Sequence, residues 1–196
     1  MTGADAAQDA AWVAIETPLA ASRLAEFCGD IERVYRINPY LEVRYWRAHA
    51  DGARVAYRNL SNNRDYELTL KLIRATDRAF AVHYDQGIKH ATRFTIEPAE
   101  NGSRLLITDD YSGAGLNPDL GEVDRSLHAW GMALRDYLRR EARWGRLAPW
   151  RWYMRRVWVP MKPSARRIAY ILLIVTLAEV ALFALVMAIY WTERSG

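Results

Sequence analysis

The sequence predicts an α+β protein, in which a curved antiparallel sheet of about seven strands wraps on one long helix and a single transmembrane helix follows. Three observations support this fold class. Apolar and polar side chains alternate with a period of two through residues 40–111, as in half-buried strands. Apolar side chains recur three and four residues apart in residues 118–143, as in an amphipathic helix. Residues 168–191 are apolar almost throughout.

The N-terminal part of the chain predicts one strand and two short helices. Residues 1–11 are small and polar and are expected to be disordered. Residues 12–17 form a short strand. Residues 20–29 carry apolar side chains at helical spacing and end at a glycine, a common helix C-cap. A second helix over residues 31–37 stops before Pro39, because the residue before a proline avoids helical angles.

Six further strands are expected in residues 40–111, arranged as an antiparallel meander. Pairs such as Asp51-Gly52 and Asn101-Gly102 separate the alternating segments at hairpin spacing. Together with the first strand they give a sheet of about seven strands.

The long helix that starts near Pro118 or Asp119 is too narrow to cover such a sheet. Seven strands about 4.8 Å apart make a sheet roughly 30 Å wide, whereas one helix with its side chains is about 10–12 Å across. We therefore expect the sheet to curl and to enclose a cavity against the helix.

This order of elements resembles the START-like superfamily, also called SRPBCC, helix-grip, Bet v 1-like or polyketide cyclase/coenzyme Q-binding proteins. The resemblance covers residues 12–146 and rests on element order and length, without a catalytic motif. It implies a helix-grip fold over a domain of residues 12–147 that holds a hydrophobic small molecule such as a lipid, sterol, quinone or aromatic polyketide. No cofactor is implied beyond a bound lipid or quinone. The apolar C-terminal segment departs from the mostly untethered members of the family.

Strand parity selects the side chains expected to line the cavity, because alternate residues of a strand point to the same face. The predicted ligand-binding residues are Tyr57, Tyr66, Tyr84, His90, Thr92, Phe94, Asp109, Tyr111, Leu127, Trp130 and Leu134. For Trp130 and Leu134 core packing is the alternative, and for His90 the alternative is a turn exposed to solvent. Asp109 and Asp110 are neighbours in a strand, so their carboxylates should point to opposite faces.

No catalytic or metal-binding pattern is legible in the sequence. The histidines and carboxylates lack the spacing of a metal site, and no glycine-rich phosphate loop follows a strand. Cys28, the single cysteine, excludes an internal disulfide and is expected to be a small core residue. The sequence therefore favours a binding protein over an enzyme.

Basic charge is concentrated just before the apolar segment. Residues 1–147 hold 20 Lys and Arg against 21 Asp and Glu, whereas residues 148–167 hold six basic residues and no acid. Tryptophans interleave with these cations, a mixture that indicates a linker at a membrane interface and not a nucleic-acid-binding face. The predicted interfacial residues are Trp150, Arg151, Trp152, Arg155, Arg156, Trp158, Lys162, Arg166 and Arg167.

Residues 168–191 are predicted to cross a bilayer. These 24 residues would reach about 36 Å as a helix, enough for a hydrocarbon core of about 30 Å. A buried core helix is the alternative. Because the basic cluster precedes the span, the positive-inside rule predicts a tail-anchored, single-pass protein of the inner (cytoplasmic) membrane with its N-terminal domain in the cytoplasm.

Glu179 lies at the midpoint of this segment, where a carboxyl group is costly unless it faces protein or water. A hydrogen bond to another transmembrane helix would satisfy it, and Ala181, Ala184 and Ala188 would allow close approach. A neutral acid tolerated in lipid is the alternative. We therefore expect other transmembrane subunits or a second copy as partners.

Taken together, the sequence predicts a membrane-anchored START-like protein that binds a lipid or quinone, as a subunit of a membrane complex. Its expected partners are membrane lipids, a hydrophobic small molecule and transmembrane subunits, with no nucleic acid. Two alternatives stay open: an accessory or assembly subunit without a ligand, and an enzyme of the polyketide cyclase or aromatase type.

Overall fold

The computed structural model describes residues 10–112 and 120–195, with side chains described for residues 10–112 and 126–194. The chain forms two compact units, Met1–Pro160 and Met161–Gly196. In chain order, the elements of the first unit are β1 (Ala10–Thr17), α1 (Ala21–Gly29), α2 (Ile31–Ile37), β2 (Leu41–His49), β3 (Gly52–Asn59), β4 (Arg64–Thr76), β5 (Ala79–Tyr84), β6 (Ala91–Ala99), β7 (Gly102–Asp110), α3 (Leu120–Trp144), α4 (Ala148–Tyr153) and the π-helix η2 (Met154–Trp158).

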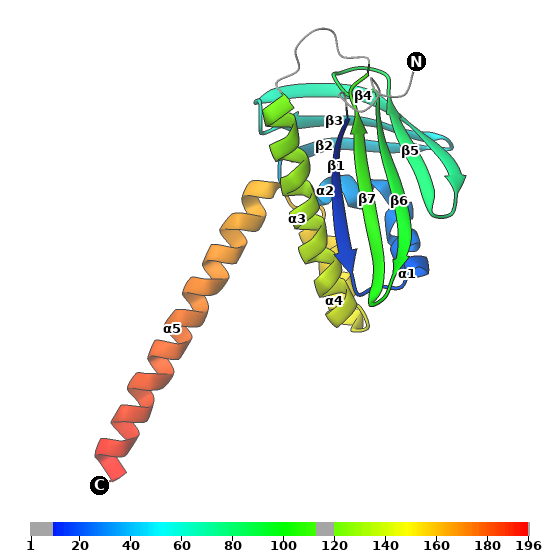
Figure 1. Ribbon diagram of the computed structural model, residues 1–196. Helices are drawn as coiled ribbons and strands as arrows, with labels where there is room; N and C mark the ends of the chain where they lie inside the picture. Colours follow the sequence, from blue (N-terminus) through cyan, green and yellow to red (C-terminus); the bar gives the residue numbers. More distant parts are fainter. Residues whose placement is uncertain (1–9, 113–119, 196) are drawn as a thin grey trace. The chain divides into compact units, whose positions relative to one another are not determined.

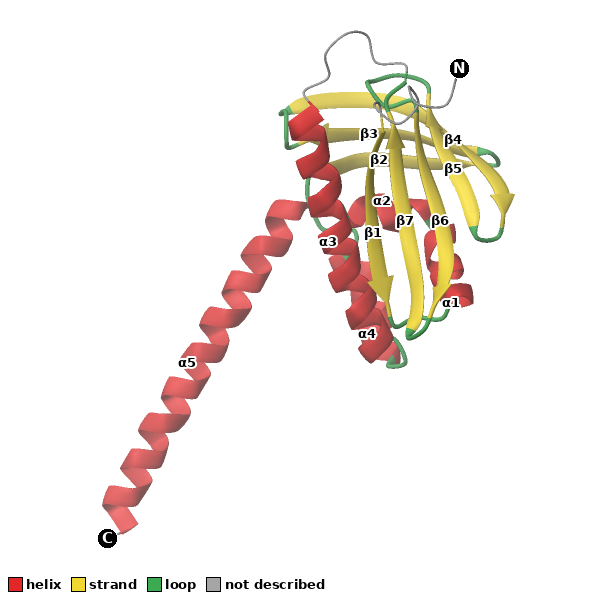
Figure 2. Cartoon of the chain, in the orientation of Figure 1, coloured by secondary structure: helices red, strands yellow, loops and turns green. Residues whose placement is uncertain are grey.

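The seven strands form one antiparallel sheet in the order β1-β7-β6-β5-β4-β3-β2. The sheet is strongly curved, and α1, α2 and α3 lie on its concave side (Figures 1 and 2). Helix α3 packs against β1, α1 against β6 and β7, and α2 against β2 and α3. The predicted α+β helix-grip fold is therefore confirmed. The predicted start of the long helix at Pro118 or Asp119 lies outside the described residues.

The core lies between the concave face and the three helices. Many of the apolar side chains that the sequence places at helical or alternating spacing are fully buried there. They include Leu24, Cys28, Val34, Phe94, Leu105, Ile107, Leu127 and Leu134. Burial raises the pKa of the Cys28 thiol to about 12, so this cysteine is a core residue that stays protonated.

A buried arginine joins α2 to the C-terminal part of α3. The Arg33 guanidinium lies 4.8 and 5.0 Å from the ring centroids of Phe27 and Tyr137, which stack on each other 5.5 Å apart. Arg33 Nε donates to the Tyr137 hydroxyl at 3.0 Å, and Nη2 lies 3.5 Å from a Glu141 carboxylate oxygen. Because arginine keeps its charge when buried, these partners are what make the position tolerable.

The segment after α3 is part of the first unit and packs against its core. Met154 and Val159 are buried in its core, and the Trp158 ring lies 5.7 Å from the Tyr137 ring. The sequence placed a domain boundary after Leu147, whereas the compact unit continues to Pro160. The sequence pattern does not separate the two cases, because the same apolar side chains could lie at a membrane interface or pack against one side of α3.

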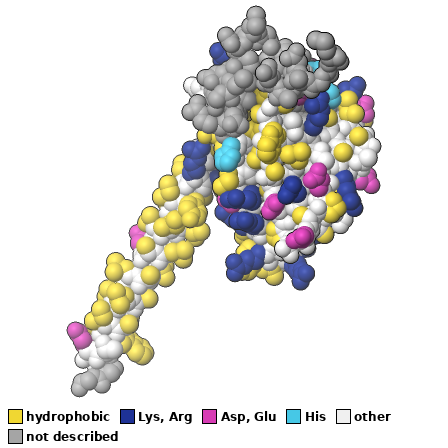
Figure 3. Space-filling model, viewed as in Figure 1, with side chains coloured by type: hydrophobic (Ala, Val, Ile, Leu, Met, Phe, Trp, Pro, Cys, Tyr) yellow, Lys and Arg dark blue, Asp and Glu magenta, His cyan; other side chains and the backbone are white. Residues whose placement is uncertain are grey.

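The second unit is a single helix, α5 (Pro163–Ser195). Its apolar side chains are exposed along its length, and hydrophobic atoms cover its surface in Figure 3. Among the described residues, α5 is the one helix long and apolar enough to be a candidate membrane span. The predicted span, residues 168–191, lies within it.

Gly102 offers a test of the strand arrangement, because the β6–β7 hairpin requires its φ of +136° and a close approach to β1. A Cβ at Gly102 would lie 2.1 Å from the Thr17 carbonyl oxygen. Gly102→Ala is expected to lower the free energy of unfolding by about 2–4 kcal/mol, through backbone strain and this clash. Urea denaturation of the detergent-solubilised chain, followed by tryptophan fluorescence, measures the change.

Gly87→Ala is the matched control. Gly87 also has a positive φ, +103°, but its Cβ position is in open space. Only the strain of about 1 kcal/mol should appear there. Equal losses for the two variants would contradict the close packing of the hairpin on β1.

Candidate ligand-binding site

A cavity of about 120 Å³ is lined by residues of α2, α3, strands β2, β3 and β5, and the turns after β3 and β5. Its walls include the side chains of Tyr35, Tyr57, Tyr84, Lys89, Tyr111 and Trp130. Typical small-molecule pockets measure about 300–1,000 Å³. The cavity therefore suits a ring or a polar headgroup, and not the whole of a long-chain lipid.

A chain of hydrogen bonds crosses the polar end of this cavity. Thr92 Oγ1 donates to Asp109 Oδ1 at 2.5 Å, and the Tyr84 hydroxyl lies 2.8 Å from Thr92 Oγ1. The Tyr35 hydroxyl in turn bonds to that of Tyr84. Because Thr92 uses its proton on Asp109, Tyr84 must donate to Thr92 and Tyr35 to Tyr84. The three hydroxyl protons are thus all directed toward the Asp109 carboxylate.

Asp109 anchors this chain from a completely buried position. It lies on β7 directly opposite Thr92 on β6. Its Oδ2 atom accepts from Lys89 Nζ, which comes from the turn between β5 and β6, and from the Tyr111 hydroxyl at 3.2 Å. A buried carboxylate without such partners would be strongly destabilising, so these contacts are a condition of its burial.

The tyrosines of the cavity remain neutral. Burial raises the pKa of Tyr35, Tyr57 and Tyr84, and the Asp109 charge raises each of them further. A neutral phenol keeps its proton and can donate it. Tyr35 and Tyr84 already use theirs within the chain.

Tyr57 differs because its hydroxyl has no partner among the described residues, although it lines the cavity. Its ring stacks on that of its cross-strand neighbour Tyr66, with centroids 5.4 Å apart. The Tyr66 hydroxyl accepts from Asn62 Nδ2 at 3.0 Å, and Tyr66 does not line the cavity. Tyr57 is therefore the phenol whose proton is available to a bound molecule.

Six of the predicted ligand-binding residues meet at this end of the sheet. Tyr57, Tyr84, Tyr111 and Trp130 line the cavity. Thr92 and Asp109 lie behind its polar wall, in the hydrogen-bond chain. Asp110 bonds to Arg93 at 2.7 Å, so the two neighbouring carboxylates do have different surroundings.

The other predicted residues lie elsewhere. Tyr66 stacks behind Tyr57, and Phe94, Leu127 and Leu134 are packed in the core away from the cavity walls. His90 is exposed, with its ring edge-on to His83. Its place in the turn before β6, and not strand parity, decides where it points.

Sequence reasoning missed seven polar lining residues: Tyr35, Asn38, Asn59, Ser61, Asn62, Lys89 and Ser126. Tyr35 and Asn38 belong to α2 and its C-cap, and Lys89 to a turn, so strand alternation gives no signal for them. A signal that could have found Lys89 is the buried acid itself, which requires a nearby cation.

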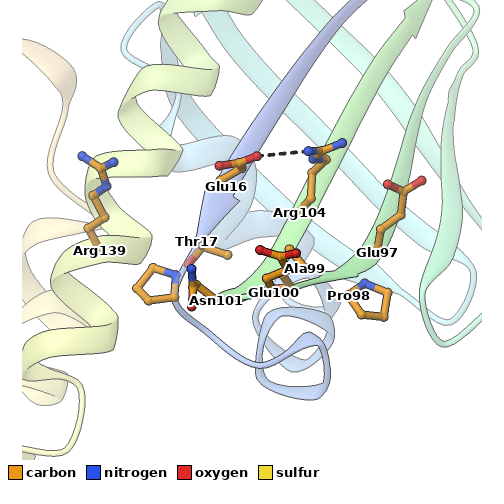
Figure 4. A pocket seen from close by; sticks show the side chains of 11 residues that line it. Glu16, Thr17, Glu97, Pro98, Ala99, Glu100, Asn101, Arg104 and Arg139 are labelled. Carbon is orange, nitrogen blue, oxygen red and sulfur yellow. Dashed lines mark hydrogen bonds and ion pairs between the residues drawn. The ribbon is translucent and has the colours of Figure 1, made fainter.

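A second hollow of the first unit, of about 610 Å³, is a different kind of feature. It lies where β1 and β6 end and β7 begins, beside α3, and charged side chains line it, including Glu16, Glu97, Glu100, Arg104 and Arg139 (Figure 4). Glu16 and Arg104 pair across it at 3.0 Å. Such an open, charged groove does not suit a hydrophobic ligand. Among the described residues no cluster of histidine, cysteine and acidic side chains could hold a metal ion.

Comparison with known proteins gives results only at the level of structure. No protein-family model matches the chain, and no curated protein sequence matches it either. Solved structures do match, over about two thirds of this chain and nearly all of theirs. A START superfamily protein from Mycobacterium smegmatis shares 14% sequence identity at a TM-score of 0.53, covering 66% of this chain and 94% of that protein.

Two further structures give similar values. A protein from Thermus thermophilus is 12% identical with a TM-score of 0.51, over 66% of this chain and 96% of its own. A protein from Deinococcus radiodurans is 14% identical with a TM-score of 0.51, over 69% of this chain and 98% of its own. The helix-grip unit of this chain therefore has the fold of the START superfamily.

Proposed function

We propose that this chain is a membrane-tethered binding protein whose cavity takes the polar ring or headgroup of a hydrophobic small molecule, a lipid or a quinone. The observation that carries the proposal is the cavity itself. The hydrogen-bond chain at its polar end uses all of its own protons, and one phenol remains available to a ligand. The START fold supports it, because this fold commonly binds hydrophobic ligands.

The hydrogen-bond directions define what the ligand should offer. Tyr57 presents a donor, so the ligand should carry a carbonyl or hydroxyl oxygen that can accept from it. The ring of Trp130 and the side chains of Leu41 and Ile88 supply apolar contacts around that group. A quinone ring or the glycerol region of a lipid combines these two properties.

Tyr57→Phe tests this assignment with the smallest possible change. It removes one hydroxyl and leaves the stacking on Tyr66 in place, so the fold should keep its stability. Loss of one hydrogen bond of about 1–1.5 kcal/mol should weaken binding roughly 5- to 15-fold. The chain purified in detergent is analysed by native mass spectrometry, and the extracted ligand is quantified by liquid chromatography–mass spectrometry.

Tyr66→Phe is the control, because that hydroxyl bonds to Asn62 and does not line the cavity. It should leave ligand occupancy near that of the unaltered chain. No co-purifying ligand in any sample, or equal occupancy in the Tyr57→Phe and unaltered chains, would count against the cavity as the binding site.

The raised tyrosine pKa values predict how stability depends on alkaline pH. In the unfolded chain each tyrosine loses its proton near pH 10, whereas in the folded chain Tyr35 and Tyr84 hold theirs. The folded state then binds more protons, so each residue's contribution is fully present below pH 10 and falls above it by about 1.4 kcal/mol per pH unit. Tyr84→Phe removes one of these tyrosines, so the free energy of unfolding should fall by about 1.4 kcal/mol less per pH unit. Urea denaturation between pH 9 and pH 11 measures both slopes, and equal slopes would show that Tyr84 is not held protonated.

We propose that α5 crosses the membrane and holds the ligand-binding unit on the cytoplasmic side. Support comes from its length and apolar surface and from the cations that precede its apolar part, Lys162, Arg166 and Arg167. Resistance of the chain to alkaline extraction from membranes is the expected result.

A second function, as a subunit of a membrane complex, is favoured by Glu179. Its carboxyl group sits midway along the apolar part of α5, where a partner helix would relieve the cost of burial in lipid. Glu179→Leu should therefore reduce co-purification of partners or the size of a homo-oligomer, by an amount corresponding to about 0.6–2 kcal/mol per contact.

Glu179→Gln keeps the hydrogen-bonding groups and is the matched control. It should preserve the assembly. Size-exclusion chromatography with light scattering and quantitative mass spectrometry of co-purified proteins follow both variants. Unchanged assembly in the leucine variant would remove this candidate function and leave ligand binding untouched.

A further inference from the structure

The end of α3 and the α4–η2 segment carry a surface that the cavity does not use. We call residues 139–156 the basic-aromatic surface. They contain seven arginines and one acid, Glu141. The Glu141 carboxylate is mostly buried and lies beside Arg33, so it does not balance the exposed arginines. Figure 3 shows Lys and Arg side chains gathered over the part of the first unit where α3 ends.

These arginines differ from those on the sheet. On the sheet, Arg54, Arg93 and Arg104 each form an ion pair with an acid on a neighbouring strand. Arg140, Arg143 and Arg156 are exposed and form no ion pair among the described residues. Unbalanced cations on one face are a platform for an anionic partner.

Large apolar side chains are exposed among the same arginines. Trp152 is 64% exposed, Leu147 51% and Trp144 42%. Trp150 and Trp158, by contrast, pack against the core. Folding thus sorts the tryptophans of this segment into an inner set and an outer set. Exposed tryptophan next to arginine is the composition of surfaces that lie at a lipid headgroup boundary.

We propose that the basic-aromatic surface docks the ligand-binding unit on an anionic lipid bilayer. The proposal rests on the tethering proposed above. Pro163 lies seven positions after Arg156, the last residue of this surface, and seven extended residues span at most about 25 Å. If α5 crosses the bilayer, the surface is therefore always within reach of the headgroups. An acidic protein is the other class of partner, but exposed tryptophans and this short connection favour lipid.

The test uses the full chain in lipid nanodiscs, with a fluorescent maleimide at Ala148→Cys, between Leu147 and Trp152. Ala75→Cys on β4 carries the control label, and both positions are exposed. Buried Cys28 should not react. Nitroxide-labelled headgroups should quench the dye at residue 148 in discs containing phosphatidylglycerol, and quench it much less in pure phosphatidylcholine. The dye at residue 75 should be quenched in neither.

Charge reversal then tests the arginines. Arg140→Glu, Arg143→Glu and Arg156→Glu combined should weaken docking on the order of a hundredfold, since each cation near an anionic surface contributes about fivefold. Arg64→Glu, Lys71→Glu and Arg78→Glu make the same change of charge on exposed positions of the sheet region, and quenching at residue 148 should persist.

The outcomes separate this inference from the tether. Quenching that is equal in both lipids, or that survives the first triple variant, overturns lipid docking. Protection of residue 148 only when an acidic protein co-purifies also overturns it. A chain that inserts in nanodiscs but shows no quenching refutes the docking surface alone, whereas a chain that fails to insert refutes the proposed tether.

Discussion

The buried carboxylate of Asp109 is the constraint on which the ligand cavity depends. A charge with no exposed surface is tolerated only where donors converge on it, and here they come from β6, from the β5–β6 turn and from the residue just after β7. Satisfying Asp109 fixes the direction of the Thr92 proton, and through it the protons of Tyr84 and Tyr35. Apolar side chains cannot replace this network without leaving polar groups unpaired. The polar end of the cavity therefore stays open to a molecule with matching groups.

The size of the cavity follows from how the concave face is covered. A sheet roughly 30 Å wide exceeds what α3 alone can cover, which is why the sequence predicts a hollow. The structure places α1 and α2 on the same face, with α1 against β6 and β7 and α2 against β2. Two short helices thus fill most of the space that a single helix would leave. Among the described residues two smaller hollows remain on this face: the one beside Tyr35 and Trp130, and one of about 230 Å³ between the α1–α2 junction and strands β2 to β5.

Strand periodicity predicted only part of the site that lies on strands, since Leu41 on β2 and Asn59 on β3 also line the cavity. Alternation assigns Tyr57, Tyr84 and Asp109 to the inner face, and their positions agree with it. Alternation cannot assign Tyr35, because Tyr35 lies on a short helix to which the strand pattern does not apply. It cannot assign Lys89 either, because residues in turns follow no periodic pattern. Alternation also does not define how far the cavity extends along each strand. Phe94, for example, lies on the inner face but packs in the core and not in the cavity wall.

The segment after α3 shows a different limit. Trp150, Trp152 and Trp158 have the same basic and apolar neighbours in the sequence, yet two of them pack inward and one faces solvent. Composition predicts that such a segment prefers an interface, but the core beside Tyr137 is an apolar surface as well. Only the fold decides which of the two each ring meets.

A tether changes the affinity that so small a cavity needs. If the apolar part of a ligand is much larger than about 120 Å³, most of it lies outside the cavity. The contacts inside the cavity can then supply only modest binding energy. A hydrophobic ligand, however, concentrates in the bilayer, and a binding unit held at the bilayer meets it at that raised concentration. With the proposed tether, weak and reversible contact through one phenol would be sufficient, and the rest of the ligand would remain in lipid. The proposed roles of α5 and of the polar groups around Asp109 would then depend on each other without any contact between them.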